Sequence, residues 1–208
     1  AIETAHRVRQ RMSAVFVHAI AEGKGSRDPA AVVTKALKPV PRSRKRPALL
    51  SVDALHDMIR KTEAEPASPL TKLASRFLAL TAQRPGMIRA LPWDEIEGID
   101  WKSYEVAPEA LWRVAPARMK LMLDLKADDG FEHLVPLSAE AVAVLRAVRV
   151  LTGRGPLAFP GNRNARVPMS ENTLSYFYNR CGYQGRHVPH GWRASFSTIM
   201  NEWAERSG

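Results

Sequence analysis

One stretch near the end of the chain reads RHVPHGWR (residues 186–193) and opens a long amphipathic run. His190 and Arg193 lie three residues apart, so on a helix they share one face. The start of a helix also favours anions, because its first backbone N–H groups have no partner within the helix. The stretch therefore predicts two phosphate-directed side chains at the start of a final helix, over about residues 190–206.

Two segments upstream add further cationic side chains. QRPG (83–86) places an arginine where an apolar run stops, and RMK (118–120) leads toward HLVPL (133–137). An arginine can form paired, charge-assisted hydrogen bonds with the oxygens of a phosphodiester, a lysine can protonate the leaving oxygen, and a histidine can donate to a non-bridging oxygen. Taken singly, each of these residues is more readily explained by a structural role. Together they predict a site for one phosphodiester, formed by Arg84, Lys120, His190 and Arg193.

Positive charge is concentrated at the start of the chain. Residues 1–48 carry +8 of the formal net charge of +10, from eleven Lys/Arg against three acids. Such asymmetry favours a polyanionic partner, although a merely soluble basic surface explains it equally well. Three prolines in KPVPRSRKRP (38–47) predict an extended linker, which either follows a phosphate backbone or is a solvated connector. Its candidate DNA-binding residues are Arg42, Arg44, Lys45 and Arg46.

The composition is that of a soluble globular protein. Hydrophobic residues make up 45% and charged residues 25% of the 208 residues, enough for one ordinary domain and a smaller appendage. No apolar run approaches the roughly 20 residues of a membrane span. Cys181 alone cannot form an internal disulfide, and no cysteine cluster suggests zinc. We therefore expect no membrane partner and a cytoplasmic location.

Helical periodicity dominates on both sides of a short β-rich segment. Apolar spacing and caps predict helices over about 5–20, 29–37 and 70–82, and helices capped by Ser51, Ser138 and Ser170. The first two helices cannot bury much core by themselves. Between 99 and 137, alternation predicts a small antiparallel sheet with a turn at 128–130 before its last strand. The fold class is therefore mostly α with a small antiparallel β-sheet (α+β), without alternating βαβ units.

The order of these motifs resembles a known family. TAQRPG, RMK…HLVPLS, PMSENTL and HGWRASFSTIMNE follow one another as in the tyrosine recombinases, in the branch of P4-type prophage and island integrases. The resemblance covers nearly the whole chain and is most specific over 168–202. It implies the tyrosine recombinase catalytic-core fold, with residues 1–37 as the end of the helical core-binding (SAM-like) domain, 38–48 as the interdomain linker and 49–208 as the catalytic domain.

The resemblance also implies an activity and a role for each site residue. Such enzymes cleave and rejoin DNA through a 3′-phosphotyrosyl intermediate, integrate or excise a prophage or genomic island, and need no metal or other cofactor. Arg84 matches the first catalytic arginine, Lys120 the sheet lysine that acts on the leaving 5′ oxygen, and His190 and Arg193 the H-x-x-R element. Lys126 is the alternative to Lys120, because the segment before the last strand is longer than in many relatives. Three residues after the first catalytic arginine, relatives usually carry a glutamate, whereas this chain has Met87.

No tyrosine of the chain matches the family's nucleophile. In relatives the nucleophile follows H-x-x-R by more than the fifteen residues present here, whereas all four tyrosines precede that element: Tyr104, Tyr176, Tyr178 and Tyr183. We therefore expect a C-terminally incomplete catalytic domain that binds DNA and cannot cleave it alone.

The resemblance implies partners as well. These are double-stranded attachment sites, other integrase protomers in a tetramer on DNA, and an excisionase or a DNA-bending accessory protein, all at the bacterial nucleoid.

Two other functions compete with this interpretation. One is a non-catalytic DNA-binding remnant of an integrase. The other is a metal-dependent phosphoesterase that uses His187 and His190, because histidines three residues apart can share a metal. No third ligand with matching spacing is evident in the sequence.

Overall fold

The computed structural model describes residues 2–41, 46–119 and 124–207. The chain divides into two compact units, Ala1–Lys45 and Arg46–Gly208. This division falls inside the predicted linker, and the assignment of domains to the two units stays a prediction. In the described ranges, no helix is long and apolar enough to cross a membrane.

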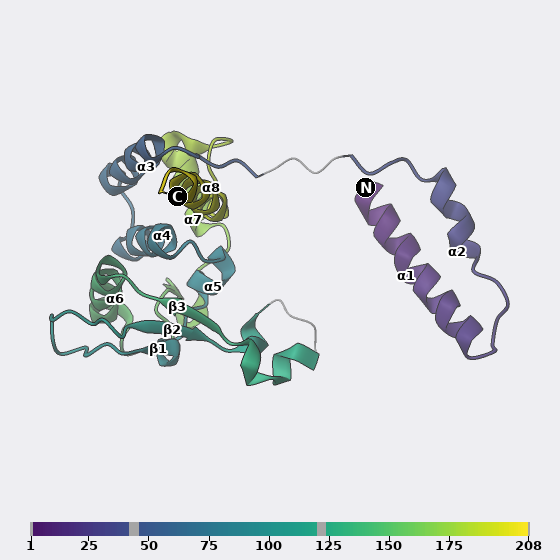
Figure 1. Cartoon of the computed structure of the whole chain (residues 1–208), viewed down its shortest axis with the longest axis horizontal. Helices are drawn as coiled ribbons and strands as arrows, with labels where there is room; N and C mark the ends of the chain where they lie inside the picture. Colours follow the sequence, from purple (N-terminus) through teal and green to yellow (C-terminus); the bar gives the residue numbers. More distant parts are fainter. Residues whose placement is uncertain (1, 42–45, 120–123, 208) are drawn as a thin grey trace. The chain divides into compact units, whose positions relative to one another are not determined.

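The N-terminal unit consists of a long helix and a short one (Figure 1). Helix α1 (Ile2–Ala21) is followed by α2 (Pro29–Val32), which continues as one 3-10 turn, η1 (Val33–Ala36). The carboxylate of Asp28 caps α2 by accepting the N–H groups of Ala30 and Ala31. No residue of α1 is buried. As the sequence predicts, two helices alone leave an apolar stripe uncovered.

The C-terminal unit contains six α-helices among its described residues. They are α3 (Val52–Ala64), α4 (Pro69–Thr81), α5 (Pro85–Arg89), α6 (Ala139–Thr152), α7 (Thr173–Tyr178) and α8 (Gly191–Ser207). Ser51 and Ser138 cap α3 and α6, as predicted, and Ser68 caps α4. The prediction that Ser170 caps a helix is wrong: its Oγ accepts the N–H of Asn172, and α7 begins one residue later.

Three strands form the predicted antiparallel sheet. Strands β1 (Ile96–Glu97), β2 (Leu111–Val114) and β3 (His133–Pro136) lie in the order β1-β2-β3, with Trp112 opposite Val135. A 3-10 helix, η5 (Asp129–Phe131), replaces the simple turn expected before β3, after two others, η3 (Pro116–Arg118) and η4 (Asp124–Ala127). A second hairpin, β4 (Pro160–Gly161) with β5 (Asn164–Pro168), was not predicted. The fold class is confirmed as mostly helical with small antiparallel sheets.

Helix α4 lies at the centre of this unit and contacts α3, α5, α6 and α7 (Figure 1). Its Phe77 packs against Trp112 of β2 and against Phe159, with both pairs of ring centroids 5.9 Å apart. All three side chains are fully buried. The breadth of apolar faces in residues 70–82 therefore reflects a central position, and the end of α4 is anchored from several sides.

Candidate functional site

The chain turns sharply where α4 ends, and this turn sets the position of Arg84. Ala82 has a left-handed backbone (φ 49°), which satisfies the end of the helix in a conformation that residues with a Cβ rarely adopt. Arg84 is then the N-terminal flanking residue of α5, and Pro85 is the first helical residue. The Arg84 side chain is exposed, and it has no hydrogen-bond partner among the residues that the structure describes.

Two distant segments are hydrogen-bonded to the same turn. Nη1 of Arg193, on the first turn of α8, donates to the carbonyl oxygen of Ala82 at 3.1 Å. Nε2 of His133, the first residue of β3, donates to Oε1 of Gln83 at 2.9 Å. The turn after α4 therefore brings Arg193 and His133 close to Arg84.

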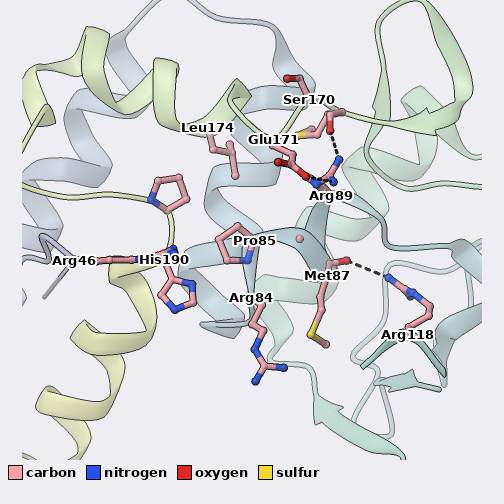
Figure 2. Close-up of a pocket in the computed structure, with 13 residues that line it drawn as sticks. Arg46, Arg84, Pro85, Met87, Arg89, Arg118, Ser170, Glu171, Leu174 and His190 are labelled. Carbon is pink, nitrogen blue, oxygen red and sulfur yellow. Dashed lines mark hydrogen bonds and ion pairs between the residues drawn. The ribbon is translucent and has the colours of Figure 1, made fainter. Parts of the chain in front are cut away.

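A pocket of about 420 Å³ lies beside this turn (Figure 2). Its polar lining comes from α5 and the residue before it, from η3, from the segments before α7 and α8, and from the first residue of the C-terminal unit. The lining side chains that bear or can bear charge are Arg46, Arg84, Arg89, Arg118, Glu171 and His190.

Two arginines of the pocket are occupied by structural bonds. Arg89 donates to the carbonyl of Met169 (3.0 Å) and to the carboxylate of Glu171 (2.8 Å). Arg118 pairs with the largely buried carboxylate of Glu95 and donates to the carbonyl of Ala90 at 2.8 Å, at the end of α5. Arg118 belongs to the RMK segment that the sequence places near the site, but its side chain holds the end of α5.

The remaining cations lie close enough to act on one another. Burial lowers the pKa of His190, and the charges of Arg46, Arg193 and Arg84 lower it further. Burial also lowers the pKa of His133, with Arg193 and Arg84 adding to the effect. Both imidazoles are therefore neutral at pH 7, and the guanidinium groups supply the positive charge. An anion would relieve their repulsion.

The structure thus brings together three of the four predicted catalytic residues: Arg84, His190 and Arg193. Of the predicted DNA-binding residues, Arg46 lines the pocket. The other predicted residues, Lys120, Arg42, Arg44 and Lys45, lie outside the described residues. Lys126, the alternative lysine, is half-buried in η4 and does not line the pocket.

His133 is a residue of this cluster to which sequence reasoning gave no role. The available signal was a polar side chain at the first position of an otherwise apolar strand, directly after the segment that carries the lysine candidates. Such a position lies at the end of a sheet, where loops meet.

The four tyrosines do not line the pocket. Tyr178 is buried, its hydroxyl is hydrogen-bonded to Ser75 Oγ and Trp192 Nε1 (both 2.9 Å), and burial raises its pKa to about 12. Tyr183 is buried, whereas Tyr104 and Tyr176 are exposed elsewhere on the surface.

The two histidines of the metal hypothesis occupy different environments. His187 is buried, and its Nδ1 accepts the N–H of Leu49 at 3.1 Å, whereas His190 is at the pocket. In the ranges 2–41, 46–119 and 124–207, no group of three or more His, Cys, Asp or Glu residues is arranged to hold a metal ion.

Comparisons with known proteins relate the chain to integrases. Residues 1–36 match the family model described as phage integrase central domain. The chain is 30% identical over 202 residues to prophage integrase IntA of Escherichia coli K12, covering 97% of this chain and 44% of that protein. It is 27% identical over 206 residues to the integrase of Enterobacteria phage P4, covering 96% of this chain and 44% of the relative. The chain therefore spans about half the length of the curated relatives it matches.

Solved structures with the same fold include two recombinases. Lambda integrase (residues 75–356) bound to DNA aligns with a TM-score of 0.56 at 20% identity, covering 93% of this chain and 63% of that one. XerA recombinase aligns with a TM-score of 0.52 at 18% identity, covering 94% and 68%. At this level of identity the likeness concerns the fold.

Proposed function

We propose that this chain is part of a site-specific DNA recombinase of the phage integrase family of tyrosine recombinases. The whole protein would cleave and rejoin DNA through a 3′-phosphotyrosyl intermediate, to integrate or excise a prophage or genomic island. The observation that carries the proposal is that Arg84, Arg193 and His190 lie near one another at the turn after α4. They lie beside a pocket in which Arg89 and Arg118 are already paired.

The scissile phosphate would lie between the two arginines. Each guanidinium can present two N–H groups to the non-bridging oxygens, which gain charge as the phosphorus becomes five-coordinate. Arg193 keeps donors for this purpose, because its bond to Ala82 uses Nη1 and leaves Nη2 and Nε. The neutral imidazole of His190 would donate a hydrogen bond to a non-bridging oxygen or move the proton of the nucleophile. His133 would support the same oxygens from the sheet side.

Two parts of this mechanism rest on the family resemblance. We assign Lys120 as the acid that protonates the leaving 5′ oxygen, on its match to the family's sheet lysine. The nucleophile would be a tyrosine supplied from outside the described pocket lining, because the two buried tyrosines cannot reach a phosphate and the two exposed ones do not line the pocket.

The partners follow from the same proposal. Duplex attachment sites and further protomers would assemble around the pocket, with an excisionase or a DNA-bending protein at the bacterial nucleoid. Residues 1–37 would belong to the core-binding domain, 38–48 to the linker and 49–208 to the catalytic domain. A basic linker suits this role, since its charges can follow a phosphate backbone.

Covalent capture tests the proposal. We would incubate the 208-residue chain, and separately the product of its full reading frame, with a nicked duplex that carries the junction sequence of the host element. A denaturant-resistant protein–DNA band is expected with the longer product only, and Arg193→Ala in that product should abolish the band.

Each other outcome has a definite meaning. A band with the 208-residue chain would show that one of its four tyrosines attacks, and our placement of the nucleophile would be wrong. Specific binding without any band from either protein would favour a non-catalytic remnant of an integrase. Capture that a chelator abolishes would revive a metal-dependent mechanism.

A further inference from the structure

The segment that joins the linker to α3 has no helix or strand, yet its backbone is bonded at three points. The carbonyl of Pro47 accepts the N–H of Val188 at 3.3 Å. The N–H of Leu49 donates to Nδ1 of His187 at 3.1 Å, and the carbonyl of Leu49 accepts from Oγ of Ser195 at 2.6 Å. Because an irregular segment must find partners for its buried polar groups, these bonds fix residues 47–49 on the start of α8.

Gly191 permits this close approach. A Cβ at this position would lie 2.8 Å from the carbonyl oxygen of Pro47 and 3.1 Å from Cε1 of His187. The first residue of α8 must therefore lack a side chain for the segment to lie against it.

His187 is unusual among the residues that hold the segment. It is 1% exposed, and its ring packs edge-on against Trp192, with centroids 5.0 Å apart, and against Tyr178. Since Nδ1 accepts a hydrogen bond, the proton must be on Nε2, which has no hydrogen-bond partner among the described residues. A ring protonated on both nitrogens would lose the bond to Leu49. Burial lowers the pKa of His187 to about 4, so the ring is neutral at pH 7.

Arg46 directly precedes this fixed segment and lines the pocket with His190 (Figure 2). After burial, the charge of Arg46 is the largest influence that lowers the pKa of His190. Residues 47–49 leave Arg46 little freedom of position, because the next residue, Pro47, is both conformationally restricted and hydrogen-bonded.

We propose that His187 is a positioning residue: by accepting the Leu49 N–H, and with Ser195 on the Leu49 carbonyl, it holds Arg46 beside His190 as a further cationic contact of the pocket. The identity of the anion as a phosphodiester rests on the proposed function, whereas the position of Arg46 does not. The competing explanation is a histidine that only fills space between Trp192 and Tyr178.

Titration of His190 tests the proposal without DNA. The pKa of His190 would be measured by NMR of the imidazole in the 208-residue chain, for the wild type, Arg46→Ala, His187→Leu and the double variant. The other charged groups that face His190 are Arg84, Arg193 and Glu171, and all of them stay in place. Removal of Arg46 should raise the pKa of His190. His187→Leu should raise it by a similar amount, and the double variant should add nothing to Arg46→Ala.

Milder variants separate positioning from packing. In His187→Asn the side-chain oxygen can replace Nδ1 as the acceptor, so the wild-type pKa of His190 should be retained. Ser195→Ala removes the second bond and should shift the pKa in the same direction as His187→Leu, which keeps the test valid if the leucine variant does not fold. Ser197→Ala, an exposed change on the same helix, should have no effect.

The result has clear alternatives. An unchanged pKa of His190 in folded His187→Leu and Ser195→Ala would overturn the proposal. So would an Arg46→Ala variant in which the pKa of His190 equals the wild-type value. If the pKa shift of His190 in the double variant equals the sum of the shifts in Arg46→Ala and His187→Leu, His187 acts on the pocket independently of Arg46, which would also overturn the proposal. A failure of the chain to bind DNA would count against the proposed function and leave these titrations unaffected.

Discussion

The arginines of the pocket illustrate how one residue type serves two purposes. Arg118 is 26% exposed and meets a carboxylate, Glu95, that is 11% exposed, so each charge depends on the other. Arg84 is exposed and has no such partner in the described part of the chain. The surroundings of an arginine, rather than its presence in a basic motif, separate a structural role from a ligand-binding one.

Substitution should reveal this difference as unequal losses of stability. Arg118→Ala leaves the Glu95 carboxylate without its cationic partner, with Trp112 Nε1 still donating to it, and frees the carbonyls at the end of α5. The free energy of unfolding should therefore fall by roughly 2 kcal/mol. Arg84→Ala should change it by less than about 0.5 kcal/mol. Denaturant unfolding of both variants and the wild type measures these changes in the free energy of unfolding. Equal losses would mean that Arg84 also has a structural partner.

His187 should make the protein sensitive to mild acid. Its pKa in the folded chain is about 4, against an ordinary value of 6.5, so the unfolded chain binds the proton more tightly. The free energy of unfolding should therefore be unaffected above about pH 7, fall as the pH drops from 6.5 to 4, and level off at a loss of about 3 kcal/mol.

Unfolding of the wild type and His187→Asn across this range isolates the contribution of His187. The free energy of unfolding of the wild type relative to His187→Asn should fall by about 3 kcal/mol between pH 6.5 and 4, because the asparagine does not titrate. The lowered pKa values of His133 and His190 act in the same direction in both proteins and cancel. Parallel curves between pH 6.5 and 4 would contradict the account.

At the scale of elements, the turn after α4 organises the site at a conformational cost. Ala82 is the one residue other than glycine with a positive φ in the described ranges. Its carbonyl oxygen accepts a hydrogen bond from Arg193, and the side-chain oxygen of its neighbour Gln83 accepts one from His133. The strain is therefore located where three segments meet.

Ala82→Gly should relieve this strain. Glycine adopts the left-handed conformation freely, so the free energy of unfolding should rise by roughly 0.5–1 kcal/mol after the larger entropy of the unfolded chain is allowed for. Ala79→Gly, inside α4, is the matched control and should lower it by about 1 kcal/mol. Thermal unfolding gives both values. A loss of stability in Ala82→Gly would show that the methyl group contributes more to packing than its conformation costs.

The sequence predicted those elements whose signals are local. Caps and apolar spacing identified α3, α4 and α6, and alternation identified β2 and β3, because these patterns follow directly from how each element buries one face. The β4–β5 hairpin was missed because the side chains of β5 are mostly exposed and show no apolar alternation. The structural role of Arg118 was not foreseen because its partner, Glu95, is 23 residues away, and no local pattern records such a pair.

At the scale of the whole chain, charge and pocket point to the same kind of ligand. The excess of basic residues before residue 49 and the cationic pocket both favour a polyanion. Residues 82–84, 133, 190 and 193 come from three segments, so only the folded structure could show that they meet. The family resemblance supplied the roles of Arg84, His190 and Arg193, and the structure supplied their proximity and added His133.

On the proposed function, Arg84 and Arg193 contact a DNA phosphate. Binding of the 208-residue chain to a short duplex, measured over a series of salt concentrations, tests it most directly. The logarithm of the affinity should fall linearly with the logarithm of the salt concentration, and loss of each arginine should reduce that slope by about 0.9. Arg60→Ala, an exposed change on α3 away from the pocket, should reduce it less. If Arg84→Ala and Arg193→Ala bind with the wild-type slope, the pocket does not hold DNA phosphate and the account is contradicted.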